Sequence, residues 1–397
     1  MSRYAGSVTT MLVPHPQNLD KVEHQLEPFT CGEPTREPLA WASLRELDLS
    51  KFDDGIESRK LLAAELVKSL HTTGFLYIKN HGLQSTVIQH HLNIANTLLK
   101  IPYEEKLAYE IVQDKASNKR YHGFAPQSYR KKTIYEDNVE HYNISRFVSE
   151  VGDEQESSFP PVLHPYLSDI KYLSEYVHKV IARKILILIA IALEVDEMTF
   201  TNIHTYEAKN DSFLRYMQYL PRSSRDNEES KDLYLPGHAD WGSLTFLFNQ
   251  PTSGLQILDQ QGDWKWVKYV PDTIVVNVGI ALGAMTGDYL KPTIHRVIKP
   301  PEDQAQRPRL SLIYFLRPYD THSLSMISSP ILKRLGRKPT IDLTMGEYTR
   351  LGKTGVFRVN YDSDKAGAQT RMFNQIKQQA SQEGEGVDTD ARDFKSI

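Results

Sequence analysis

The second half of the chain is built from short β-rich segments. They begin after residue 211, and Gly, Pro and Asn punctuate the stretches between them. Many short strands with such turn signals are typical of a β-sandwich or a jelly roll. The segments are "FLRYMQYL", "GSLTFLF", "GLQILD", "WKWVKYV", "TIVVNVG", "TIHRVI" and "RLSLIYFL".

The first half has a different texture. Residues 58–73 carry leucines at helical spacing, and the helical period returns over residues 165–195. We therefore predict an α+β fold, in which N-terminal helices wrap a jelly-roll core. The expected regions are a loosely ordered arm (1–40), a mainly helical region (41–205), the jelly-roll core (206–320), a C-terminal helical cover (321–379) and a disordered tail (380–397).

Composition excludes several classes of protein. Cys31 is the only cysteine, so the chain has no internal disulfide and no cysteine-built metal site. A net charge of −3 provides no basic excess for nucleic acid or an anionic membrane surface. The longest apolar run, Ile185–Leu193, is far shorter than the ~20 residues that span a bilayer. The N-terminus lacks the apolar stretch of a secretory signal. We expect a cytoplasmic protein without nucleic-acid or membrane partners; its oligomeric state stays open.

A histidine and an aspartate stand at the mouth of one predicted strand, in "PGHADWGSLTFLF" (236–248). His238 and Asp240 are two residues apart, so on a strand both side chains point to the same face. Neither contributes to an apolar core, and together they suit a divalent metal. Two histidines and one carboxylate form the facial triad of non-haem Fe(II) oxygenases. An H-x-D pair alone also fits ordinary turn chemistry.

Two later strands supply partners for this pair. His295 lies in the β-branched segment "PTIHRVI", where a core histidine bonded to the backbone is the alternative. Arg309 and Ser311 share one face of the next strand, among apolar neighbours. A buried guanidinium is costly unless it meets a carboxylate. A small dicarboxylic acid, bound by the guanidinium and the hydroxyl, would meet that requirement.

The motifs, taken together and in order, resemble the isopenicillin N synthase-like branch of the 2-oxoglutarate/Fe(II)-dependent dioxygenases. The resemblance runs from about residue 44 to residue 345. It rests on "GFLYIKNHGL", "LRYMQYLP", "GHADWGSLTFLF", "GLQIL", "GDWKWV", "VVNVG", "IHRV" and "RLSLIYFLRP".

This resemblance implies a double-stranded β-helix and an enzyme that needs Fe(II), O₂ and 2-oxoglutarate as co-substrate. The reaction would oxidise a small organic molecule by hydroxylation, desaturation or ring rearrangement, with release of succinate and CO₂. The iron ligands would be His238, Asp240 and His295, and 2-oxoglutarate would be bound by Arg309, Ser311 and Tyr219.

The chain departs from the family pattern at three places. Ile280 follows "NVG", where an acidic residue is usual, and Met217 replaces a frequent asparagine. The segment between His295 and Arg309 carries an extra hydrophilic stretch, "PPEDQAQRP". None of these changes removes a proposed iron ligand.

Four further side chains are candidates for the substrate pocket. By the resemblance, the loop that carries Tyr121 and His122 lies at the substrate mouth. Trp241 follows Asp240 directly, and Phe315 shares the strand face of Arg309 by the period of two. For each of these side chains, plain packing is the alternative role. By family analogy the enzyme would act in secondary metabolism.

Three rival functions stay open from the sequence. One is an Fe(II) oxidase of the same fold that does not use 2-oxoglutarate. A second is a catalytically silent barrel that binds a small molecule. The third is a zinc hydrolase, because two histidines and a carboxylate also hold zinc, although no general base accompanies the set.

Overall fold

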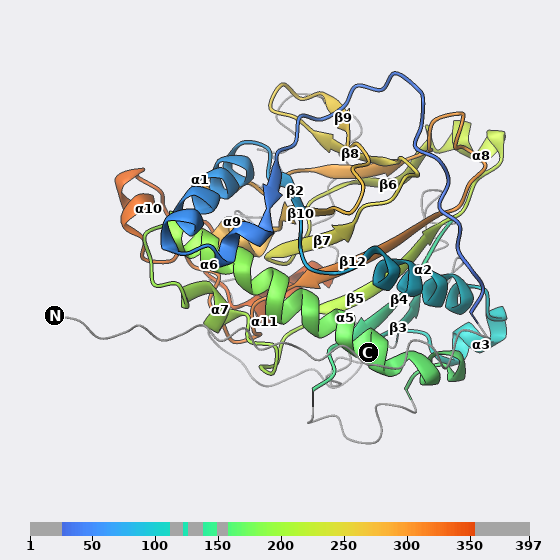
Figure 1. Ribbon diagram of the computed structural model, residues 1–397, viewed down its shortest axis with the longest axis horizontal. Helices are drawn as coiled ribbons and strands as arrows, with labels where there is room; N and C mark the ends of the chain where they lie inside the picture. Colours follow the sequence, from blue (N-terminus) through green and yellow to red (C-terminus); the bar gives the residue numbers. More distant parts are fainter. Residues whose placement is uncertain (1–25, 112–121, 126–137, 149–157, 354–397) are drawn as a thin grey trace, which may run out of the picture.

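Two β-sheets form the centre of the computed structural model, which describes residues 26–111, 122–125, 138–148 and 158–353. Figure 1 shows the helices α1, α6, α5 and α2 lying across the larger sheet. Strands β6, β8 and β9 of the smaller sheet lie above the larger sheet in this view. The expected tail, residues 380–397, lies outside the described residues.

The larger sheet has eight strands, and their pairing is antiparallel except between the first two. In spatial order they are β1 (Glu46–Asp48), β2 (Phe75–Lys79), β10 (Ile274–Val278), β7 (Leu244–Phe248), β12 (Arg309–Leu316), β5 (Phe213–Tyr219), β4 (Val139–Ser145) and β3 (Gly123–Ala125).

The smaller sheet has four antiparallel strands, and its central strand β11 pairs with both β6 and β8. In spatial order the strands are β6 (Leu233–His238), β11 (His295–Ile298), β8 (Leu255–Leu258) and β9 (Trp264–Trp266).

Apolar side chains at every second strand position join the inner faces of the two sheets. Phe75 and Tyr77 of β2 and Val275 of β10 pack in one cluster with Leu255 and Ile257 of β8. A second cluster joins the sheets through Met217, Tyr219, Tyr234 and Val297.

Helices cover the outer face of the larger sheet and bury the main hydrophobic core. The run "ILILIAIA" makes up most of α6, and its apolar side chains from Ile185 to Ala190 are buried, as the sequence predicts. The helices are α1 (Ile56–Thr72), α2 (Ser85–Leu99), α3 (Tyr103–Ala108), α5 (Leu167–Tyr176), α6 (Arg183–Ala192), α7 (Thr199–Ile203), α8 (Ser224–Glu229), α9 (Ile280–Met285), α10 (Pro330–Arg334) and α11 (Met345–Lys353), with 3₁₀ turns η2 (Leu49–Asp53) and η3 (Pro161–Tyr166) and a π-helical turn η4 (Val177–Ala182). In the part of the chain that the structure describes, every helix is too short or too polar to cross a bilayer.

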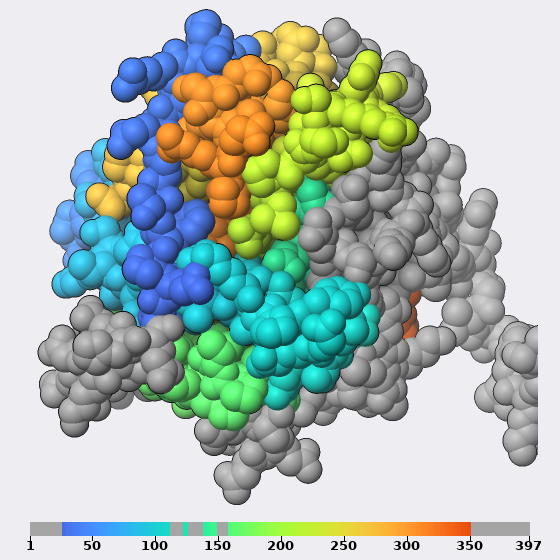
Figure 2. All heavy atoms as spheres, turned by 90° about the vertical axis from the view of Figure 1, so that its right-hand side faces the viewer, coloured from blue at the N-terminus to red at the C-terminus, as the bar shows by residue number. Residues whose placement is uncertain are grey.

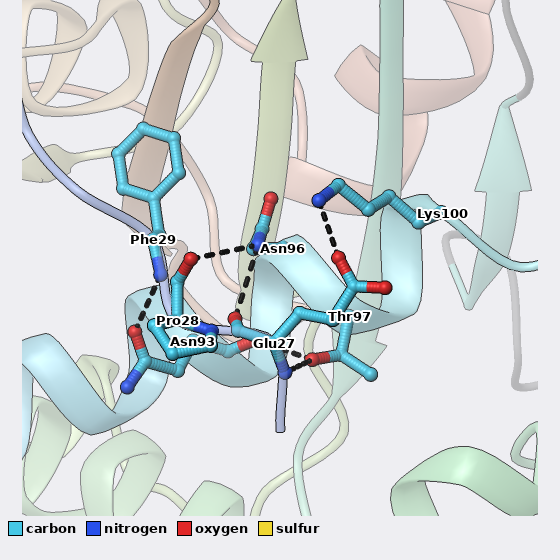
Figure 3. Close-up of polar contacts among 7 residues, drawn as sticks. All are labelled: Glu27, Pro28, Phe29, Asn93, Asn96, Thr97 and Lys100. Atoms are coloured by element: carbon cyan, nitrogen blue, oxygen red, sulfur yellow. Dashed lines mark hydrogen bonds and ion pairs between the residues drawn. The ribbon is translucent and has the colours of Figure 1, made fainter. Parts of the chain in front are cut away.

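Residues 26–40, from the arm that we expected to be loosely ordered, make defined contacts. The Phe29 backbone N–H donates to Asn93 Oδ1 of α2 at 2.9 Å, one of several polar contacts shown in Figure 3. The arm then reaches the smaller sheet, where the Trp266 N–H donates to the Ala40 carbonyl at 2.9 Å. Figure 2 shows this blue segment passing beside the orange segment that precedes β12.

Two buried histidine–tyrosine pairs join the helical layer to the larger sheet. His91 of α2 has its Nδ1 2.9 Å from the Tyr216 hydroxyl of β5. His178 of η4 has its Nδ1 2.8 Å from the Tyr314 hydroxyl of β12, and its Nε2 donates to the His204 carbonyl at 2.6 Å. Burial lowers the pKa of both His91 and His178 to about 3.

The depressed pKa values predict a loss of stability on acidification. Below about pH 6.5 an unfolded imidazole binds a proton, whereas His178 in the folded protein stays neutral until about pH 3. Each such histidine therefore lowers the free energy of unfolding by about 1.4 kcal/mol per pH unit in that window. In urea unfolding between pH 7 and pH 5, the free energy of unfolding of His178→Gln should fall less steeply with decreasing pH than that of the parent. Tyr314→Phe, which leaves His178 buried, should retain the pH dependence of the parent. An equal pH dependence in His178→Gln and the parent would contradict the prediction.

Candidate functional site

The pairing of β6 with β11 brings two histidines together. His295 lies opposite His238 in the antiparallel register, and their ring centroids are 4.3 Å apart. Asp240 lies just beyond the end of β6, and its Oδ1 is 3.8 Å from Nε2 of each histidine. One donor atom from each of the three residues lies within 4.8 Å of the others. The three residues singled out by their sequence pattern therefore form one cluster.

Backbone carbonyls fix the orientation of both imidazole rings. His238 Nδ1 lies 2.9 Å from the Pro236 carbonyl oxygen, and His295 Nδ1 lies 3.1 Å from the Thr293 carbonyl oxygen. Only a protonated Nδ1 can make these contacts, since a carbonyl oxygen is an acceptor. The Nε2 atoms are then left with lone pairs that face Asp240, which is the arrangement of metal-bound histidines.

Asp240 is held by two hydrogen bonds to one of its oxygens. Its Oδ2 accepts from the Thr245 hydroxyl of β7 at 2.6 Å and from the Asn277 amide of β10 at 2.8 Å. These contacts leave Oδ1 directed at the histidines. Burial opposes ionisation of this carboxyl, but His295, His238 and the two hydrogen bonds together lower its pKa. The carboxylate is therefore ionised at neutral pH.

The surroundings of His238 keep its imidazole neutral, chiefly through burial of the ring. Burial, followed by the nearby His295, lowers the pKa of His238 to about 4. The side chain nevertheless remains 37 % exposed, so the cluster is accessible from that side. A neutral imidazole and an ionised carboxylate are the states in which these groups bind a metal. Two nitrogen donors and one oxygen donor suit Fe(II) with open positions for other ligands.

Arg309 and Ser311 lie at the start of β12, on the larger sheet. Arg309 is 6 % exposed; its Nη1 donates to Ser311 Oγ at 2.7 Å and its Nε to the Thr252 carbonyl at 3.3 Å. Burial lowers the pKa of the Arg309 guanidinium. Within the described residues it has no ion pair with a carboxylate, so its charge has no protein counter-ion there. An anionic ligand would supply one.

Tyr219 is the cross-strand neighbour of Arg309. The two residues pair between β5 and β12, and the Arg309 Cζ lies 5.6 Å from the centroid of the Tyr219 ring. Burial raises the pKa of Tyr219 to about 12, so its hydroxyl keeps its proton and can donate a hydrogen bond. A small pocket beside Arg309 is lined from both sheets, by Leu247 and Val275 on one and Leu255 on the other.

The expected pocket residues lie in different surroundings. Phe315 pairs with Thr245, the residue that binds Asp240, and stacks on Phe213 with centroids 4.8 Å apart. Trp241 packs edge-to-face on Tyr348 of α11, with centroids 6.4 Å apart. The structure therefore brings Phe315 and Trp241 close to the cluster.

His122 lies elsewhere. Its ring packs against Phe159 and Tyr142, whose side chains belong to the core between the larger sheet and the helices. The structure does not bring His122 to the cluster of His238, Asp240 and His295. Tyr121 lies outside the described residues.

Sequence reasoning missed Thr245 and Asn277. Each is a buried polar residue inside an otherwise apolar strand, in "LTFLF" and "IVVNV". That isolated polarity was the signal that could have identified them, because a polar group buried in a sheet needs a partner. Their shared partner, Asp240, becomes evident only from the neighbouring positions of β7 and β10.

Profiles of known families match both halves of the chain. The 2OG-Fe(II) oxygenase superfamily matches residues 210–318. The N-terminal region of the non-haem dioxygenase in morphine synthesis matches residues 45–165. Together the two matches span more than half of the 397 residues.

Individual proteins are also similar to this chain. A 2-oxoglutarate-Fe(II) type oxidoreductase of Emericella nidulans is 27% identical over 290 residues, which cover 68% of this chain and 78% of the relative. A 1-aminocyclopropane-1-carboxylate oxidase of Dictyostelium mucoroides is 24% identical over 315 residues, covering 68% and 81%.

A solved structure shares the fold. A Neurospora crassa protein, crystallised at full length in complex with alpha-KG and thymine, superimposes with a TM-score of 0.67 at 23% identity, over 80% of this chain and 99% of that chain. This likeness confirms the expected α+β fold with a double-stranded β-helix.

We predict that the hydrogen bonds to Asp240 raise the affinity of the cluster for a divalent metal. Thr245→Val keeps the side-chain shape but removes the donor, and partners of this kind typically change metal affinity by about 10- to 100-fold. Metal dissociation constants, measured by calorimetry with Mn²⁺, should therefore rise in Thr245→Val. Thr245→Ser retains the hydroxyl and should bind close to the parent value. Unchanged affinity in Thr245→Val would show that Asp240 is oriented by other contacts.

Proposed function

Because the chain belongs to the 2-oxoglutarate/Fe(II)-dependent dioxygenase superfamily, we propose that its Fe(II) is held by His238, Asp240 and His295. The observation that carries this proposal is the convergence of two Nε2 atoms and one carboxylate oxygen within 4.8 Å. The Nδ1 contacts of both histidines and the neutral state of His238 at pH 7 support it further.

The chain is an oxidoreductase that needs Fe(II), 2-oxoglutarate and O₂. When bound, these components supply the oxidation of a C–H bond of a small organic molecule, with release of succinate and CO₂. The protein's own residues orient the reactants and exclude water from the reaction. Hydroxylation, desaturation and ring rearrangement all remain within this chemistry.

The distal carboxylate of 2-oxoglutarate is assigned to Arg309 and Ser311. A carboxylate beside Arg309 would neutralise a guanidinium that is 6 % exposed, and it would also accept a hydrogen bond from the Ser311 hydroxyl. The protonated Tyr219 hydroxyl provides a further donor on the same sheet. In this arrangement the co-substrate spans from the larger sheet to the iron ligands on the smaller sheet.

The primary substrate is assigned to the side of the cluster where Phe315 and Trp241 lie. Phe315 is a cross-strand neighbour of Thr245, and Trp241 follows Asp240 directly. Their aromatic rings supply apolar walls that would exclude water from a small organic substrate. A role in secondary metabolism and a cytoplasmic location complete the proposal; the single cysteine is compatible with a reducing compartment.

The iron assignment is tested by anaerobic Fe(II) titration of the apo protein, followed in the visible spectrum. His238→Ala, Asp240→Ala and His295→Ala should each abolish stoichiometric binding, because a three-donor site loses a third of its ligands. Their circular dichroism should match the parent. His164→Ala, which removes an imidazole outside the cluster, should bind iron normally. Full iron binding in any of the three ligand variants would overturn the assignment.

The same titration separates a 2-oxoglutarate-dependent enzyme from an oxidase. A visible band that requires both Fe(II) and 2-oxoglutarate is expected. Iron binding without such a band, together with O₂ uptake that does not need 2-oxoglutarate, would instead support the Fe(II) oxidase.

Arg309→Lys tests the co-substrate assignment. Lysine keeps the charge but loses the planar fork, and a hydrogen bond to a charged group contributes about 1.5–3 kcal/mol. The dissociation constant of 2-oxoglutarate should therefore rise by about 10- to 100-fold, while Fe(II) affinity is retained. Arg307→Lys, on the exposed loop before β12, serves as the matched control. Equal 2-oxoglutarate affinity in Arg309→Lys and the parent would contradict the assignment.

A further inference from the structure

A buried glutamine lies in the segment that connects the last metal ligand to the guanidinium. Gln304 belongs to "PPEDQAQRP", the hydrophilic stretch that departs from the family pattern, and it is 2 % exposed. Its neighbours Asp303 and Gln306 are exposed. A buried side-chain amide in a polar surface loop is unusual unless its hydrogen bonds are satisfied.

The side-chain amide of Gln304 makes three hydrogen bonds, all of them to backbone groups. Its Nε2 donates to the Pro251 carbonyl at 3.0 Å and to the Glu33 carbonyl at 2.8 Å. Its Oε1 accepts from the Ser253 backbone N–H at 2.8 Å. The amide therefore binds the backbone on both sides of Thr252.

Thr252 is the residue whose carbonyl receives the Arg309 Nε, at 3.3 Å. Gly254, two residues on, packs closely against the Arg309 side chain: a Cβ there would lie 3.1 Å from Arg309 Cδ and 3.3 Å from Arg309 Nε. The segment 251–254 therefore packs directly against the Arg309 side chain. Its backbone position depends in turn on the hydrogen bonds that Gln304 makes to Pro251 and Ser253.

The N-terminal arm binds the loop that carries Gln304. The Glu33 carbonyl takes the second amide proton of Gln304, and the next residues of the arm bind the same loop. The Thr35 hydroxyl donates to Asp303 Oδ1 at 2.7 Å, and Arg36 N–H donates to Asp303 Oδ2 at 2.8 Å. The contact between the arm and this loop is visible in Figure 2, where the blue and orange surfaces adjoin.

We propose that Gln304 is a positioning residue for 2-oxoglutarate binding, acting through Thr252 and the guanidinium of Arg309. This inference rests on the proposed role of Arg309 as the co-substrate anchor. Gln304 does not contact the metal ligands through any of its hydrogen bonds, so its effect falls on the co-substrate rather than on iron. The hydrophilic stretch and the arm thus stabilise the position of Arg309 through the 251–254 segment, without contacting its guanidinium through these hydrogen bonds.

The test compares three variants by calorimetric titration of the Fe(II)-loaded, anaerobic protein with 2-oxoglutarate. Gln304→Leu has similar volume and loses all three hydrogen bonds. Gln304→Glu keeps an acceptor for Ser253 but places a second oxygen against two carbonyls. Gln306→Leu, in the same loop but exposed, is the matched control. Both Gln304 variants should raise the 2-oxoglutarate dissociation constant by about tenfold or more, and Gln306→Leu should leave it unchanged.

Two further readouts separate positioning from general stability. The Fe(II) dissociation constant should stay within about twofold of the parent. In assays of succinate formed from 2-oxoglutarate without a primary substrate, the KM for 2-oxoglutarate should rise while kcat at saturating 2-oxoglutarate is retained. A purely structural role would lower the urea midpoint without moving the 2-oxoglutarate constant, and that outcome would overturn the proposal. If Gln304→Leu does not fold, Gln304→Glu carries the same test.

Arg309→Lys in the same titration distinguishes the two levels of inference. Weaker binding in Arg309→Lys with normal binding in both Gln304 variants would overturn the role of Gln304 alone. Normal binding in Arg309→Lys would overturn the anchor itself and, with it, the role of Gln304.

Discussion

The antiparallel pairing of β6 with β11 determines the geometry of the whole site. It places His238 opposite His295, and no loop has to bring the two imidazoles together. A slip of one residue would turn one of them to the other face of the sheet, because strand side chains alternate. β11 is also paired with β8 on its other edge, which opposes such a slip. Asp240 then needs only the short continuation of β6 to reach both rings.

A second constraint is the free-energy cost of burying polar groups. Asp240, Arg309 and Gln304 are each less than a tenth exposed, and each unpaired would cost free energy. Hydrogen-bond partners from elements distant in sequence offset this cost. Strands β7 and β10 supply donors to Asp240. The arm and the 251–254 segment supply partners to Gln304. For Arg309 the described residues provide only neutral partners. That asymmetry supports the proposal that a ligand carboxylate binds beside Arg309.

Local patterns were enough to predict a β-rich core and to single out His238, Asp240 and His295, which the structure brings into one cluster. The partners of those residues depend instead on strand order. Nothing in the sequence near Asp240 says that β7 and β10 are adjacent, although both are needed to place Thr245 and Asn277 beside it. The positions of loop residues were harder to predict than those of strand residues. Gln304 is buried although it lies in a hydrophilic stretch. His122, expected at the substrate mouth, packs against the core residue Tyr142 of β4. In each case a tertiary contact between distant segments decides the structure, and such a contact leaves no local pattern.

The division of the site between the two sheets has a mechanical consequence. The histidines belong to the smaller sheet, whereas Arg309 and its neighbours on β12 and β5 belong to the larger one. A co-substrate that contacts both sets therefore spans the interface between the sheets. The separation of the two sets is determined by the apolar side chains packed in that interface, among them Val275, Ile257 and Val297. Since closely packed interiors transmit small changes of volume, a change of volume at these core residues would alter that separation. The hydrogen bonds of Gln304 to the arm and to the 251–254 segment act from outside that interface, on the backbone that contacts the guanidinium. The packing of the sheets determines how far the proposed iron ligands lie from it.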